Sequence, residues 1–421
     1  MPLTPTVRLA SAITVSPAAC TAPSPLQIAL PALPALRGLA LPATFALYGL
    51  LMGSWAGRLP AIKQGLQLTH TQLAMVLLCS GVGAVLSPQL SSRLLSRLGS
   101  LHTLRIAGLT LAGVLMAAAA APSLPWLMAA VLALGVTAST FDLAMNGLAA
   151  RHEARQRTPM MSRLHACACA GGLGGVTLGS VMASMQVTAM QQFSLLALPL
   201  CGLLWLCLQG LGSIAGIEPG NGRAARVATA GDDPGSESGP AFVLPRGRLA
   251  LLGALGLLGA IAEGSIGSWS SLFMKEQFGA SDALAPLSLS AFSMMMLVSR
   301  CFGDRMKARH GARTLVCAGS ATAACGLGIA VFAPGAITAL VGFGLAGLGL
   351  ALVFPFVYSA AGRESKRALA GVATMGYAGS LMGPPLMGTI AEGLGLQAAL
   401  ACLALLAAAM AVVAHRARLL Q

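Results

Sequence analysis

The chain has 421 residues, of which 56% are hydrophobic and 9% charged, with a mean hydropathy of +0.79. A soluble protein averages about 25% charged residues because its surface faces water, so this composition excludes a soluble globule. The formal net charge of +14 lies in short basic clusters between apolar stretches rather than on one basic face, which excludes a nucleic-acid-binding protein.

Residues 1–38 are rich in Pro, Ala and Thr and are predicted to form a disordered cytoplasmic tail. Apolar segments of about 20 residues then recur, and this length crosses ~30 Å of hydrocarbon at 1.5 Å per residue. Residues 213–247, rich in Gly, Asp, Glu, Arg and Pro, are predicted to be a flexible cytoplasmic linker between the bundles 39–212 and 248–414. Residues 415–421 are predicted to be a short cytoplasmic tail. The predicted spans are 39–57, 71–91, 103–121, 126–148, 164–185 and 193–212, then 248–270, 284–303, 314–333, 336–358, 371–391 and 396–414.

The two halves of the chain carry similar stretches in the same order. Gly53-Ser54-Trp55 is echoed by Gly267-Ser268-Trp269, and each is followed by a basic loop that ends in glycine, at Gly99 and Gly311. A repeat of half a membrane protein is typical of transporters built from two bundles with a site between them. We therefore predict an all-α integral membrane protein of twelve transmembrane helices in two pseudo-symmetric six-helix bundles.

The basic residues predict the orientation of these spans. With the N-terminus inside, all of the 26 Lys and Arg except Arg58, Lys63 and Lys275 lie in cytoplasmic tails, loops or helix ends. Cytoplasmic loops of membrane proteins carry an excess of Lys and Arg. Both termini are therefore predicted to be cytoplasmic, in a multi-pass protein of the inner cell membrane.

The loops after spans 2 and 8 carry related motifs. The first runs from Ser92-Arg93 to Arg97-Leu98-Gly99, and the second from Gly303-Asp304-Arg305 to Arg309-His310-Gly311. With six plus six spans and a long central loop, this pattern resembles the major facilitator superfamily. The resemblance implies a cytoplasmic latch between the halves, and Ser96, in place of the family's usual Asp, predicts a weaker first latch. The implied gate residues are Arg93, Arg97, Gly99, Gly303, Asp304, Arg305, Arg309 and Gly311.

Finer features resemble the YbjJ-like branch of that superfamily, a relative of fucose permease-type sugar/proton symporters. The resemblance covers about residues 39–414 and implies a two-bundle transporter, but it brings no settled substrate. The features that carry it are Gly53-Ser54-Trp55 with Arg58-Leu59-Pro60, Asp142 to Asn146, His165, Glu263-Gly264, Trp269-Ser270 and Gly376-Tyr377-Ala378-Gly379 with Gly383-Pro384-Pro385.

Ionisable groups inside spans cost roughly 2.5–3.5 kcal/mol each on insertion scales, so each one requires a reason. Glu263 lies deep in span 7 and is a candidate proton-coupling carboxylate or substrate acceptor, expected to share one cavity with Tyr48. The alternative is a structural Glu that bonds a neighbouring Ser or backbone group. Asp142 and Asn146 are spaced i,i+4 and so share a face of span 4, which suits proton exchange. Equally, Asp142 could cap the interior end of the helix and pair with basic residues there.

Five further side chains are weaker candidates. His165, at the start of span 5, titrates near neutral pH in its unperturbed form, although a histidine there more often caps the helix. Trp55, Trp269 and Tyr377 suit the wall of a solute site, but anchoring at the membrane interface explains them equally well. For Arg58, near the outer mouth, pairing with lipid phosphate is favoured over pairing with a substrate anion.

The sequence contains no phosphate-cradling loop, metal-ligand cluster or nucleophile–base pair, which excludes an ATP-driven pump and predicts no enzymatic activity, cofactor or metal. We predict a monomeric secondary transporter of a small solute. Its bundles would rock about a midplane site, driven by an ion gradient, with H⁺ as the first choice. Two alternatives stay open: export of amphiphilic compounds, favoured by Met294-Met295-Met296, and a membrane sensor that has lost transport.

Overall fold

The computed structural model describes residues 34–156, 160–197, 201–202, 205–206 and 245–420, and no strand occurs among them. Residues 1–33 of the predicted tail 1–38 lie outside the described residues. Residues 207–244, which include most of the predicted linker, lie outside them as well. The elements are α1 (Pro34–Gly65), α2 (His70–Ala119), α3 (Leu124–Gln156), α4 (Met161–Ser184), α7 (Arg248–Phe278), α8 (Leu287–His310), α9 (Ala312–Val331), α10 (Ala336–Leu350), α11 (Val353–Glu364), α12 (Lys366–Leu394), α13 (Leu396–Arg416) and the 3-10 helix η1 (Arg418–Leu420).

The helices agree with twelve membrane crossings. Eight described helical segments are long and apolar enough to cross a membrane, and α2 supplies two crossings because Gly99 interrupts it with φ 73° and ψ 168°. Both ends of α2 lie beside the C-terminal end of α1. The first residue of α2 contacts Lys63 of α1, and Ala118, near the last residue of α2, lines a cavity together with Leu66, which follows α1. The shorter apolar part of α8 and the long α12 fit two further crossings, and the described residues 189–197, 201–202 and 205–206 are helical where the sixth span is predicted.

The two halves repeat one another in backbone detail. Gly311 lies 212 positions after Gly99 and adopts nearly the same conformation, φ 78° and ψ 153°. These angles fall in a region that side-chain-bearing residues rarely adopt, so glycine is needed where each basic loop turns into the next helix. The predicted duplication is therefore visible in the fold.

Glycines allow close contact between paired helices in both halves. A Cβ atom on Gly49 would lie 1.9 Å from the carbonyl oxygen of Ala168, so α1 and α4 touch backbone to backbone. In the second half, a Cβ atom on Gly379 would lie 2.3 Å from the carbonyl oxygen of Leu257, which brings α12 equally close to α7. Small residues at such contacts are typical of membrane helices, which gain packing energy from close approach.

Gly175→Ala should destabilise the protein, because its Cβ would lie 2.2 Å from the carbonyl oxygen of Leu50, a backbone atom that cannot rotate away. Such overpacking costs roughly 1–3 kcal/mol, which we expect to lower the melting temperature in detergent by about 1–3 °C for a chain of this length. Gly174→Ala is the matched control, since nothing lies within 4 Å of its Cβ position. Equal melting temperatures for the two variants would contradict this packing.

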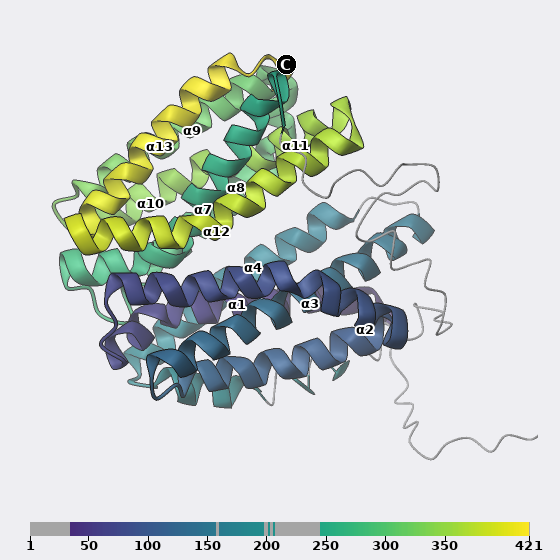
Figure 1. Ribbon diagram of the computed structural model, residues 1–421, viewed down its shortest axis with the longest axis vertical. Coiled ribbons are helices and arrows are strands. Elements are labelled where there is room, and N and C mark those ends of the chain that lie inside the picture. The colour runs from purple at the N-terminus through teal and green to yellow at the C-terminus, as the bar shows by residue number, and fades with distance from the viewer. Residues whose placement is uncertain (1–33, 157–159, 198–200, 203–204, 207–244, 421) are drawn as a thin grey trace, which may run out of the picture.

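The halves approach each other at one end and diverge at the other, as the left and right sides of Figure 1 show. The end where they approach carries the α1–α2 turn, and we call it the Gln67 end. The opposite end carries the Gly99 turn and the C-terminus, and we call it the Gly99 end. The interface between the halves is called the seam.

Two segments predicted to be tails include ordered structure. The first helix, α1, already begins at Pro34. At the other terminus, Leu420 of η1 is fully buried, and Arg313 donates a hydrogen bond to the carbonyl oxygen of His415. The last residues described therefore pack against the second half at the Gly99 end.

Candidate transport site

Glu263 of α7 and Arg300 of α8 form an ion pair within the second half. One carboxylate oxygen of Glu263 lies 3.8 Å from Nη2 of Arg300, and both side chains are about one-third accessible, at 31% and 32%. The other carboxylate oxygen, Oε2, is buried and has no hydrogen-bond partner among the described residues. The pair is therefore loose, and it leaves polar atoms available to a further ligand.

Arg300 also reaches the first half. Its Nη1 lies 3.7 Å from Sγ of Cys169 in α4, while its Nε donates to the carbonyl oxygen of Ala351 at 3.2 Å. The sequence groups Arg300 with the basic residues at the cytoplasmic end of its helix, and it gave no sign that this side chain would contact the first half. Arg300 lies ten positions before the end of α8, where its charge faces the seam.

Solvent accessibility along α7 falls sharply after Ser268, five positions beyond Glu263. Gly264, Gly267 and Ser268 are partly accessible, as is Glu263, whereas Trp269 and the next five residues are buried. In α1, residues 57–60 are likewise all buried. The Glu263 face of α7 is therefore accessible up to a closed layer on its Gln67 side.

The span-4 candidates form a second cluster, in the first half. Asn146 donates a hydrogen bond to Oδ1 of Asp142 at 2.9 Å, so the two side chains share a face of α3 as predicted. The Asn146 Oδ1 atom is buried without a hydrogen-bond partner among the described residues. His165 lies within electrostatic range of Asp142, and its exposed ring packs edge-on against Phe45 at 5.5 Å.

The structure places the aromatic candidates in different surroundings. Tyr48 stacks on Phe141 at 5.4 Å within the first half, near Asp142, rather than beside Glu263. Trp55 and Trp269 are 8% and 0% accessible, so neither presents a ring face to an open space. Tyr377 is 75% accessible and lies within electrostatic range of Tyr358, which in turn lies near Glu263.

Ion pairs join the two halves at the Gln67 end. Of the residues that form them, the sequence singled out only Lys63, as a basic residue outside the cytoplasmic clusters. His70, the first residue of α2, pairs with Glu276 at 2.9 Å and approaches Glu392 within 3.8 Å. Lys63 pairs with the same Glu276 at 2.6 Å. The ring of His70 also stacks on Trp269 at 6.1 Å. These contacts seal the seam above the buried layer.

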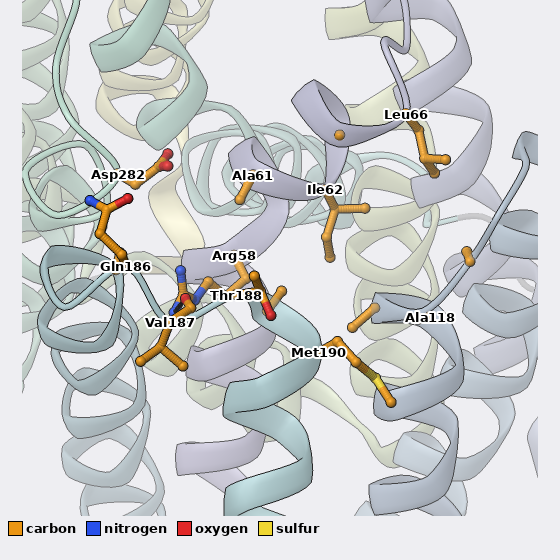
Figure 2. Close-up of a pocket in the computed structure, with 15 residues that line it drawn as sticks. Arg58, Ala61, Ile62, Leu66, Ala118, Gln186, Val187, Thr188, Met190 and Asp282 are labelled. Atoms are coloured by element: carbon orange, nitrogen blue, oxygen red, sulfur yellow. Dashed lines mark hydrogen bonds between the residues drawn. The ribbon is translucent and has the colours of Figure 1, made fainter.

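Arg58 is held by the protein itself. It is 4% accessible and donates hydrogen bonds to Oε1 of Gln192 and to the carbonyl oxygen of Val187, which tie α1 to the segment after α4. It lines a cavity of about 450 Å³ at the Gln67 end, which Asp282 of the second half also borders (Figure 2). Neither lipid phosphate nor a substrate anion is needed to explain this arginine.

At the Gly99 end, the described contacts of several basic residues stay within one half. Lys307 lies over the ring of Phe356 at 5.2 Å, and Arg105 over that of Trp205 at 4.7 Å. The motif residues Arg93, Arg97, Arg305 and Arg309 are exposed, and Gly303 is buried. The side chain of Asp304 lies outside the described set, so the latch stays a prediction. Among the described residues, no group of three or more His, Cys, Asp or Glu could hold a metal ion.

Two helical halves that are sealed at one end, with an ion pair at the seam beneath the seal, define a membrane transporter of the two-bundle class. The model of the Major Facilitator Superfamily matches residues 40–363 and, separately, 251–419. The chain therefore belongs to the Major Facilitator Superfamily, a family of secondary transporters. The YbjJ-like branch within it stays a prediction.

Similar proteins agree with this assignment. An uncharacterized MFS-type transporter of Yersinia pestis is 30% identical over 374 residues, which are 86% of this chain and 91% of the relative. The membrane protein MosC of Rhizobium meliloti is 28% identical and matched over 85% of this chain and 84% of its own. A crystal structure of the nucleoside transporter NupG, a D323A mutant, superposes with a TM-score of 0.71 over 91% of this chain and 100% of that chain. At 15% identity, this likeness concerns the fold.

Proposed function

We propose that the protein is a proton-coupled transporter of a small polar solute, with Glu263 as the proton-carrying group. The observation that carries this proposal is the loose Glu263–Arg300 pair at the seam. A charged pair inside a membrane protein is costly and commonly marks a substrate or proton pathway. Asp142 with Asn146, in the first half, is the second candidate for proton exchange.

The positive-inside rule supports placing the Gly99 end on the cytoplasmic side of the inner membrane. The ion pairs at the Gln67 end would then close the outer side, so this conformation would face inward. Solute would enter when those pairs separate and the Gly99 end closes, which is alternating access by rocking of the two halves. Arg93, Arg97 and the 303–311 motif would latch the halves in that second conformation.

Protonation of Glu263 would change the contacts of Arg300. An ionised Glu263 holds the guanidinium by charge, whereas a protonated Glu263 does not, so Arg300 becomes free to bind solute or to strengthen its contact with the first half. Because Arg300 touches both halves, a change in its partners is transmitted to the seam. A proton gradient could thereby drive solute movement.

Reconstituted protein tests the proposal. Proteoliposomes are incubated with a pooled metabolite extract, with and without an inward proton gradient, and the trapped solutes are identified by mass spectrometry. We expect at least one solute to accumulate only with the gradient. No accumulation under either condition would contradict transport and favour the sensor alternative.

The seal at the Gln67 end makes a separate prediction. Glu276→Lys removes the carboxylate that Lys63 and His70 share and places a second lysine beside Lys63, so the outer side should open more often. Ser271 is 2% accessible, and a cysteine introduced there by Ser271→Cys reports the opening. Its labelling by a membrane-impermeant thiol reagent should become roughly fivefold faster, because exposed ion pairs contribute ~0.2–1 kcal/mol each.

The exchange of both charges supplies the control. Lys63→Glu combined with Glu276→Lys restores the pair that the structure shows at 2.6 Å, so the labelling rate should return close to that of the parent protein. If the double variant is labelled as fast as Glu276→Lys alone, this ion pair does not hold the seam closed.

Export of amphiphilic compounds receives less support. The methionine run that favoured it does not line one open surface, because Met294 is 44% accessible whereas Met296 is 6% accessible. The groups at the seam are instead a carboxylate, a guanidinium and a thiol.

A further inference from the structure

We infer that the solute carries a carboxylate and that Arg300 is the residue that recognises it. This inference rests on the proposed transport function and adds the chemical class of the solute. A guanidinium presents five N–H donors in a planar fork that matches a carboxylate in two parallel hydrogen bonds.

The donors of Arg300 are incompletely used. Its Nε has an ordinary partner, the carbonyl oxygen of Ala351 at 3.2 Å. Its two Nη atoms have only distant contacts in the described structure, with Cys169 Sγ at 3.7 Å and Glu263 Oε1 at 3.8 Å. With the side chain 32% accessible, both Nη atoms can be approached from the seam.

The charge of Arg300 also requires a partner when Glu263 is protonated. Of the described groups, Cys169 of α4 and the carbonyl of Ala351 contact Arg300, and Tyr358 of α11 lies near Glu263; none of these three is a carboxylate. An unpaired charge within a membrane-spanning helix is unfavourable. A solute carboxylate would replace the charge that Glu263 loses, so one proton and one anion would cross together.

The burial of the two candidate tryptophans argues against a neutral sugar. Flat sugar faces pack on exposed indole rings, but Trp55 and Trp269 are 8% and 0% accessible. On the accessible face of α7 beside Glu263 stand Gly264, Gly267 and Ser268, which leave room without providing a stacking surface. Recognition at this seam therefore depends on charge more than on aromatic stacking.

Binding to the purified full chain in detergent tests the inference with matched probes. Lactate, benzoate and glucuronate are each compared with the corresponding primary amide, lactamide, benzamide and glucuronamide, by thermal shift at pH 5.5 and 7.5. At least one acid should stabilise the protein and its amide should not, with tighter binding at pH 5.5. In Glu263→Gln, binding should no longer depend on pH.

Variants assign the effect to the guanidinium. Arg300→Gln should weaken binding of the acid about 10- to 100-fold, because hydrogen bonds to charged groups contribute ~1.5–3 kcal/mol, whereas Arg416→Gln, exposed at the end of α13, should not. The inference is overturned if no acid binds, if the amides bind equally well, or if Arg300→Gln binds the acids as the parent does. Proton-driven accumulation of a neutral solute would overturn it too, while leaving the proposed function intact.

Discussion

Glu263→Gln should abolish proton-driven accumulation of the solute while leaving exchange of solute across the membrane in place. Glutamine has nearly the same shape as glutamate and keeps a hydrogen-bonding oxygen, but it cannot carry a proton. In the parent protein, an imposed pH gradient should raise the accumulation ratio roughly tenfold per pH unit, since a tenfold ratio corresponds to about 1.4 kcal/mol. In the variant, the ratio should stay near 1 at every gradient.

The measurement is uptake in proteoliposomes, with solute counterflow as the test that the variant still folds and binds. Glu364→Gln is the matched control, because that carboxylate is exposed at the end of α11 and makes no described contact with Arg300. If the accumulation ratio of Glu263→Gln still followed the pH gradient, Glu263 would not be the coupling group, and Asp142 would be the next residue to test.

Joining the halves at the Gln67 end should stop transport. Nζ of Lys275 in α7 lies 2.7 Å from Oε1 of Gln64 in α1, so cysteines at these two positions can be bridged by a short bifunctional thiol reagent. In a background without the native cysteines, the bridge should reduce uptake by about tenfold or more, because rocking requires this end to open. Cleavage of a reducible bridge should restore uptake.

Each single cysteine variant, treated with the same reagent, controls for modification alone. If the bridged protein transports at the rate of the unbridged one, the halves do not separate at this end during the cycle. The proposed alternation between two conformations would then be wrong, although the family membership and the fold would stand.

The fold could be predicted from the sequence because membrane spans leave a strong signal in it. A run of about 20 apolar residues is the length that a membrane-crossing helix requires, and the glycines at positions 99 and 311, at matching places in the two halves, indicated the duplication. The spaced glycines at positions 49, 53, 171 and 175 lie where α1 contacts α4, but their spacing does not by itself show which two helices pair.

The candidate site was harder to predict, because sequence alone does not show which face of a helix meets the other half. Arg300 was grouped with the loop charges that follow it, although it lies inside the apolar stretch 284–303, and that position was the available signal. The ion pairs of His70 with Glu276 and Glu392 join residues more than 200 positions apart, and no local pattern predicts them. The burial of Trp55 and Trp269 likewise depends on the closed Gln67 end, which is a property of tertiary structure.

Proton movement that accompanies solute entry tests the central claim most directly. Proteoliposomes loaded with a pH-sensitive dye, at equal pH inside and outside, receive a solute identified by the uptake screen. The account predicts that the interior acidifies as the solute enters, and that Glu263→Gln takes up the same solute down its gradient without acidification. Solute entry with no change of internal pH in the parent protein would contradict it.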